Sequence, residues 1–165
     1  MLKRVSSQMH LSNSKPFISI KIYINSNLYK PYMADSKKIL FVCVENAGRS
    51  QMAEGFFRKF ASREYESLSA GTKPIDSINP LAVEVMKEVG IDITKQNPKI
   101  VSDDMIQNSF KVVNMGCMDK DSCPALFVNN LIDWNIEDPK GEPIDRVRKI
   151  RDEIETKVKE LVANL

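Results

Sequence analysis

Short apolar segments alternate with helical segments between residues 37 and 165, and this alternation is the strongest constraint on the fold. Residues 39–42 form a continuous apolar run, as is typical of a strand buried on both faces of a sheet. Further strand-like segments follow at 66–71, 110–115 and 128–134. Strands that alternate with helices form right-handed crossovers. We therefore expect an α/β fold with a doubly wound parallel sheet.

The expected helices have recognisable ends and apolar stripes. Residues 50–60 and 144–161 each repeat apolar side chains at helical spacing. Asn79-Pro80 opens another helix, with proline in the first turn and a stop at Gly90. Ser102 is expected to cap a short helix that ends at about residue 109. These elements predict one domain over residues 37–165.

Residues 1–36 do not fit this pattern and are predicted to be a basic N-terminal extension. The segment contains no acidic residue before Asp35. It is either an over-extended reading frame whose true start is Met33 or an organelle transit peptide. The first explanation predicts that deletion of residues 1–32 leaves fold and activity unchanged.

Charge and length exclude several partners. The chain has 165 residues with 24 basic and 22 acidic side chains, for a formal charge of +2. Such a near-balance gives no reason to expect nucleic acid or a membrane as a partner, and the apolar runs are too short to cross a bilayer. We expect a cytoplasmic monomer.

The cysteine and histidine content limits the possible chemistry. Three cysteines, an odd number, do not form a disulfide framework and are better explained as thiols in a reducing compartment. The one histidine, His10, lies in the extension. A catalytic triad, a Cys-His pair or a histidine-based zinc site is therefore not expected, and we predict no bound metal or other cofactor.

The loop at the end of the first predicted strand has the composition of an oxyanion site. Ligands of an open parallel sheet bind beyond the carboxyl ends of its strands. There, consecutive backbone N–H groups, the start of the next helix and the Arg49 guanidinium form a cradle for a tetrahedral anion. The predicted oxyanion-binding residues are Val44, Glu45, Asn46, Ala47, Gly48 and Arg49.

Cys43 lies at the foot of this cradle and is the predicted nucleophile. The positive field of the loop favours a thiolate, and the Ser50 hydroxyl is placed to donate to the sulfur. Asn46 suits a left-handed kink, and Gly48 lets the backbone approach the ligand closely.

The sequence resembles the low-molecular-weight protein tyrosine phosphatase superfamily, most closely its thioredoxin-coupled arsenate reductase branch. The resemblance is carried by residues 40–54, by Ser69-Ala70-Gly71 and by residues 86–93. The resemblance runs to about residue 160. It implies a three-layer fold with a four-stranded parallel sheet flanked by helices. It also implies arsenate or a phosphate ester as the substrate.

The resemblance assigns roles to the other two cysteines. It implies that Cys43 forms an arsenic adduct, that Cys117 attacks it to release arsenite, and that Cys123 then attacks Cys117. The resulting disulfide is presented to thioredoxin or another dithiol reductant. The spacer between Cys117 and Cys123 is one residue shorter than the family pattern, so the closed loop must fold differently. In a phosphatase without reductase activity, neither Cys117 nor Cys123 takes part in catalysis.

Asp138, which precedes Pro139, is the predicted general acid. Glu137 is the neighbouring alternative for the general acid. The other explanation of Asp138-Pro139 is a simple turn with no catalytic role. Some relatives bind potassium through residues that match Asn46, Glu54 and Ser69, but Lys99 replaces their acidic fourth ligand. We therefore predict that the Lys99 ammonium occupies the place of the cation.

Three functions remain open from the sequence. The first is arsenate reduction, and the second is hydrolysis of phosphomonoesters through a phosphocysteine at Cys43. The third is a non-enzymatic oxyanion or redox sensor that needs no Asp138. The aromatic pair that grips phosphotyrosine is not evident near Asp138, where Trp134 stands alone, and this favours the reductase.

Overall fold

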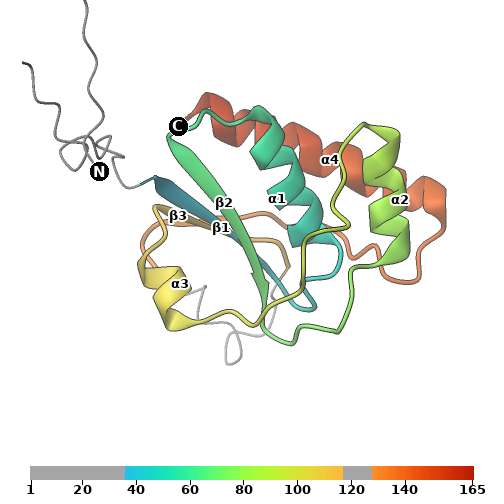
Figure 1. The fold of residues 1–165 in the computed structure, drawn as a ribbon, viewed down its shortest axis with the longest axis horizontal. Coiled ribbons are helices and arrows are strands. Elements are labelled where there is room, and N and C mark those ends of the chain that lie inside the picture. Colours follow the sequence, from blue (N-terminus) through green and yellow to red (C-terminus); the bar gives the residue numbers. More distant parts are fainter. Residues whose placement is uncertain (1–35, 117–127) are drawn as a thin grey trace, which may run out of the picture. The chain divides into compact units, whose positions relative to one another are not determined.

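The computed structural model describes residues 36–116 and 128–165, which contain one four-stranded parallel sheet. The strands are β1 (Lys37–Cys43), β2 (Tyr65–Gly71), β3 (Lys111–Asn114) and β4 (Leu131–Asp133), in the order β2-β1-β3-β4 (Figure 1). In the register of β1, Val42 pairs with Ala70 on one side and Asn114 on the other. The expected α/β fold is confirmed.

Four helices within residues 36–116 and 128–165 form the outer layers. They are α1 (Arg49–Phe60), α2 (Pro80–Glu88), α3 (Asp103–Gln107) and α4 (Ile144–Ala163). Helices α1, α2 and α4 lie on one side of the sheet and α3 on the other (Figure 1). The alternation of side chains along β1 explains both cores. Ile39 and Phe41 pack into the larger apolar cluster, whereas Leu40 and Val42 pack into the smaller one with Ile106 of α3.

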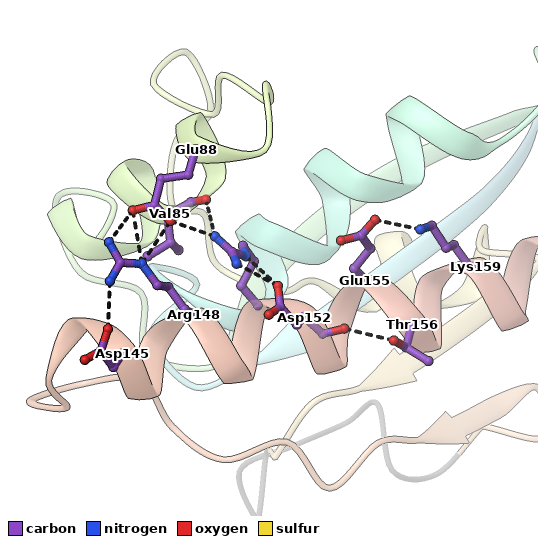
Figure 2. Close-up of polar contacts among 9 residues, drawn as sticks. Val85, Glu88, Asp145, Arg148, Asp152, Glu155, Thr156 and Lys159 are labelled. Carbon is purple, nitrogen blue, oxygen red and sulfur yellow. Dashed lines mark hydrogen bonds and ion pairs between the residues drawn. The ribbon is translucent and has the colours of Figure 1, made fainter.

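Helices α2 and α4 are joined by an ion-pair network. The Glu88 carboxylate of α2 accepts hydrogen bonds from Arg148 and Arg151 of α4, and Arg148 also pairs with Asp145 (Figure 2). Arg151 is mostly buried and donates to the Val85 carbonyl at 2.9 Å. The hydrogen bond from Arg148 holds the pKa of Glu88 below its usual value. The network fixes how α4 crosses the end of α2.

The helix ends follow the expected chemistry. Pro80 occupies the first turn of α2, where its missing N–H costs nothing. The Ser102 side chain accepts from the Met105 N–H and caps α3. None of the helices in the described part of the chain combines the length and apolar composition of a bilayer-spanning segment.

Several strands and helices begin or end a few residues away from their predicted bounds. The third strand is shorter than residues 110–115, although the N–H groups of Phe110 and Met115 still donate to β1 carbonyls at 2.8 Å. The fourth strand has only three residues, Leu131–Asp133. Asn130 precedes it and directs its side-chain amide to the Ser109 and Phe110 carbonyls. Helix α1 begins at Arg49, one residue before the predicted start.

Candidate active site

Cys43 is the last residue of β1, and its sulfur lies at the foot of a tight loop. The Asn46 N–H donates to Cys43 Sγ at 3.2 Å, and Ser50 Oγ lies 3.0 Å from the same sulfur. The side chain of Cys43 is almost fully buried. A backbone N–H and a side-chain hydroxyl therefore both contact this sulfur.

The Ser50 hydroxyl has a defined direction because Asn46 Nδ2 donates to Ser50 Oγ at 2.8 Å. A hydroxyl that accepts from Asn46 retains its own proton to donate, and the nearest acceptor is Cys43 Sγ. Asn46 is held in the predicted left-handed conformation, with φ 50°. Its Oδ1 accepts from the Lys99 N–H at 2.9 Å, which fixes the kink from outside the loop.

Arg49 and Asp138 meet at this loop although they lie 89 residues apart. Arg49 Nη2 donates to Asp138 Oδ2 at 2.7 Å, and Arg49 Nη1 donates to the Ile136 carbonyl at 3.1 Å. Arg49 is only 6% exposed, so its guanidinium has little freedom to turn elsewhere. Glu137, the alternative to Asp138, pairs instead with Arg146.

A cleft of about 270 Å³ opens above Cys43. Three segments line it: the loop after β1, the segment before α2 and the segment that begins at Asp138. The lining residues are Cys43, Glu45, Ala47, Gly48, Arg49, Ile75, Ser77, Ile78, Asn79, Pro80, Asp138, Pro139 and Lys140. The cleft has room for a tetrahedral oxyanion next to the sulfur.

Comparison with known proteins identifies the family. The model of the family described as "Low molecular weight phosphotyrosine protein phosphatase" matches residues 38–165. The chain belongs to this family. A curated relative, Arsenate reductase 2 of Staphylococcus haemolyticus, is 39% identical over 126 residues, which are 75% of this chain and 95% of that protein.

Solved structures of the low molecular weight phosphatase family have the same fold. A thioredoxin-dependent arsenate reductase of Corynebacterium glutamicum is 36% identical, with a TM-score of 0.65 over 78% of this chain and 61% of that chain. The YwlE arginine phosphatase of Geobacillus stearothermophilus is 28% identical, with a TM-score of 0.70 over 78% and 92% of the two chains. The three-layer architecture that the resemblance implied is confirmed.

The remaining predicted residues divide into two groups. The structure brings Ser50, Arg49 and Asp138 together with Cys43. Of the predicted oxyanion-binding residues, Glu45, Ala47, Gly48 and Arg49 line the cleft, whereas Val44 and Asn46 do not. Cys117 and Cys123 lie outside the described residues. Trp134 is buried against Phe41, with ring centroids 5.9 Å apart, and is not among the residues that line the cleft.

Two glutamines that support the loop were not predicted from the sequence. Gln51 Nε2 donates to the Asn46 carbonyl at 2.8 Å, and Gln96 Nε2 donates to Gln51 Oε1 at 3.0 Å. Both side chains are buried. Gln51 lies beside the apolar stripe of α1, so the sequence indicated that its amide would be buried and would need a hydrogen-bond partner. No local sequence pattern marks Gln96 in this way.

Three described glycines lie where a Cβ would collide with the site, and a Cβ on Gly116 would overlap Nη1 of Arg49. A Cβ on Gly48 would lie 2.9 Å from Pro139 Cγ, so this glycine makes room for the proline after Asp138, a reason the sequence did not give. A Cβ on Gly71 would lie 2.5 Å from the Val44 carbonyl oxygen and 2.9 Å from the Asn46 nitrogen. The end of β2 is therefore packed directly against the oxyanion loop.

We predict that Gly71→Ala will lower the free energy of unfolding by about 1–3 kcal/mol, because overpacked sites cost that much, and will weaken phosphate binding because the loop backbone must shift. Urea unfolding and isothermal calorimetry measure the two effects. Gly90→Ala is the matched control: its Cβ meets nothing within 4 Å, but its φ of +74° is strained. It should lose stability and keep phosphate affinity. Unchanged phosphate affinity in Gly71→Ala would contradict the prediction.

Glu54 and Ser69, two of the residues predicted to match a potassium site, are already paired with each other. Glu54 Oε2 accepts from the Ser69 hydroxyl at 2.5 Å, and Lys99 Nζ lies 3.9 Å from the same oxygen. Glu54 Oε1 accepts from Arg58 at 2.6 Å. Within the described residues, no group of three or more His, Cys, Asp or Glu side chains is arranged to hold a metal ion.

Replacement of sodium by potassium at constant ionic strength is therefore expected to leave the initial rate unchanged, because two basic side chains already neutralise Glu54. Steady-state assays in matched chloride buffers measure this. A clear rise of the rate in potassium would count against the assignment of Lys99 to the place of the cation.

Proposed function

We propose that this protein is an arsenate reductase that uses Cys43 as its nucleophile and a thioredoxin-like dithiol protein as its electron donor. Cys43, Arg49 and Asp138 line one cleft, and this observation supports the chemistry most directly. A curated relative that is 39% identical is named arsenate reductase, and a structural neighbour that is 36% identical is a thioredoxin-dependent arsenate reductase.

In the proposed first step, the N–H groups of the loop 43–49 and the Arg49 guanidinium bind the oxygens of arsenate. The Cys43 sulfur attacks arsenic while the Ser50 hydroxyl, 3.0 Å away, keeps the sulfur in line. A hydroxide must leave as the sulfur–arsenic bond forms. Asp138 is the proposed acid that protonates this hydroxide, so that it departs as water.

The reduction itself takes place when the Cys117 thiolate attacks the Cys43 sulfur. The sulfur–arsenic bond breaks and its electron pair goes to arsenic, so arsenate is reduced by two electrons and leaves as arsenite. Cys123 then attacks Cys117, which releases Cys43 and leaves a Cys117–Cys123 disulfide. A dithiol reductant restores the two thiols and is itself oxidised to a disulfide.

Hydrolysis of a phosphate ester is the second candidate. The same cradle suits a phosphoryl group, and the arginine phosphatase with a TM-score of 0.70 supports this alternative. A phosphatase needs only Cys43, Arg49 and Asp138 and leaves the other two cysteines unexplained. Among the described residues that line the cleft none is aromatic, which gives an aryl ester little to stack against.

A parallel assay tests the proposed function. Arsenate-dependent oxidation of reduced thioredoxin and hydrolysis of p-nitrophenyl phosphate and of a phosphoarginine peptide are measured on the same preparation. A reductase will oxidise thioredoxin only when arsenate is added and will release arsenite in equal amount. Fast hydrolysis of either phosphoryl substrate without arsenate-dependent oxidation would favour the phosphatase, and binding without either reaction would favour the sensor.

A further inference from the structure

The segment that begins at Asp138 is joined to the oxyanion loop by two ion pairs. One pair links Arg49 to Asp138 at 2.7 Å. The other links the Lys140 ammonium to the Glu45 carboxylate. The Lys140 N–H also donates to Asp138 Oδ1 at 3.0 Å, so Lys140 contacts the proposed acid through its backbone and the oxyanion loop through its side chain. Both Glu45 and Lys140 line the cleft.

The first of these pairs must weaken when an oxyanion binds. Arg49 lines the cleft beside Cys43, and in the free protein its Nη2 donates to Asp138. A bound dianion attracts the same guanidinium and repels the Asp138 carboxylate. Among the ion pairs of the described cleft residues, the Glu45–Lys140 pair then remains to link the loop after β1 to the segment that begins at Asp138.

We propose that Glu45 and Lys140 are positioning residues that hold Asp138 over the bound oxyanion. The proposal rests on the proposed function, in which Asp138 donates a proton. The hydrogen bond that the Lys140 ammonium donates to the Glu45 carboxylate raises the pKa of Lys140, so the lysine stays charged throughout the neutral range. The Lys140 side chain is 67% exposed. Such pairs contribute little to stability, so removal of the pair should affect catalysis rather than folding.

The leaving group of an ester substrate separates this role from a general loss of activity. Phenolate from phenyl phosphate needs a proton to depart, whereas p-nitrophenolate departs without much help. Lys140→Met and Glu45→Gln are expected to lower kcat/KM for phenyl phosphate about three- to five-fold, the range of one exposed ion pair. They should leave kcat/KM for p-nitrophenyl phosphate within about 1.5-fold of the wild-type value, since general acid catalysis contributes little there. Equal losses on both esters would overturn the proposal.

Two further variants serve as controls. Lys149→Met removes an exposed lysine of α4 outside the cleft and is expected to behave as the wild-type protein. The charge exchange Glu45→Lys with Lys140→Glu restores an ion pair of opposite direction. It should recover much of the loss on phenyl phosphate, which a purely structural defect at either residue would not allow.

Hydrogen exchange tests the proposal without turnover. Amides 136–142 are followed by quenched-flow exchange and mass spectrometry, with and without saturating inorganic phosphate. Phosphate should speed exchange several-fold in Lys140→Met but not in the wild-type protein, because only the variant lacks the second link. Equal exchange in both phosphate-bound proteins would overturn the proposal, even if neither ester is hydrolysed. Failure of the arsenate assay with the expected exchange result would refute only the proposed function.

Discussion

Cys43→Ser will abolish both arsenate reduction and ester hydrolysis, yet it will leave phosphate binding intact. The hydroxyl is a far weaker nucleophile than the thiol, so we expect losses on the order of 10⁴- to 10⁶-fold in kcat, as for other enzymes that lose their nucleophile. The substitution is nearly isosteric. The Arg49 guanidinium and the amides of the loop remain in place to bind the anion, because Ile136, Asp138 and Gln51 hold them independently of the sulfur.

Steady-state kinetics and isothermal calorimetry with phosphate measure these two effects. Ser50→Ala is the graded control, since it removes a hydrogen bond to the sulfur but leaves the thiol. It should lower kcat by about 10- to 100-fold, in the range of one lost hydrogen bond to a charged group. Substantial turnover by Cys43→Ser would refute the proposed nucleophile, and loss of phosphate binding would mean that the sulfur is needed to build the cradle.

Cys117→Ser will abolish multiple-turnover arsenate reduction and keep the hydrolysis of p-nitrophenyl phosphate within about three-fold of the wild-type rate, since hydrolysis does not pass through the relay. The arsenic adduct then has no second thiol to break it. Thioredoxin oxidation and arsenite release report the first activity, and p-nitrophenolate release reports the second.

Cys123→Ser provides the matched comparison. Cys117 can still expel arsenite once, so this variant should release one arsenite per protein and accumulate a Cys43–Cys117 disulfide, detectable by mass spectrometry after alkylation. Sustained reduction by Cys117→Ser would show that the relay is wrong. Sustained reduction by Cys123→Ser would instead show that the external reductant attacks the first disulfide directly.

Local chemistry made much of the site predictable from the sequence. Cys43, Asn46 and Ser50 are close in the chain, and their spacing between a strand and a helix determines the contacts that they make. The left-handed conformation of Asn46 was predicted because few residues tolerate it. Asp138 was predicted from the proline that follows it, and the structure shows its carboxylate rather than that of Glu137 at Arg49.

Long-range contacts left no comparable pattern. Glu45 and Lys140 are 95 residues apart, and neither has neighbours in the sequence that indicate a partner. Gln96 supports Gln51 across a distance of 45 residues. A Cβ on Gly71 would collide with backbone atoms of Val44 and Asn46 in the loop after β1, and only the packed structure reveals this. The length of the fourth strand was overestimated because Val128 and Trp134, on either side of it, are apolar residues that pack into the two cores. The Trp134 N–H still donates to the Asn114 carbonyl at 2.7 Å.

The nucleophile and its proposed acid come from opposite parts of the chain, and this order has a consequence for biosynthesis. Arg49 is restrained by Ile136 and Asp138, and the segment that carries them leads into α4, which packs against α1. A ribosome must therefore release nearly the whole chain before the guanidinium is held over the sulfur. Until then the nascent polypeptide carries an ordinary cysteine. A pulse of thiol-specific reagent during translation should label Cys43 of stalled chains that end before residue 136 no faster than a simple thiol.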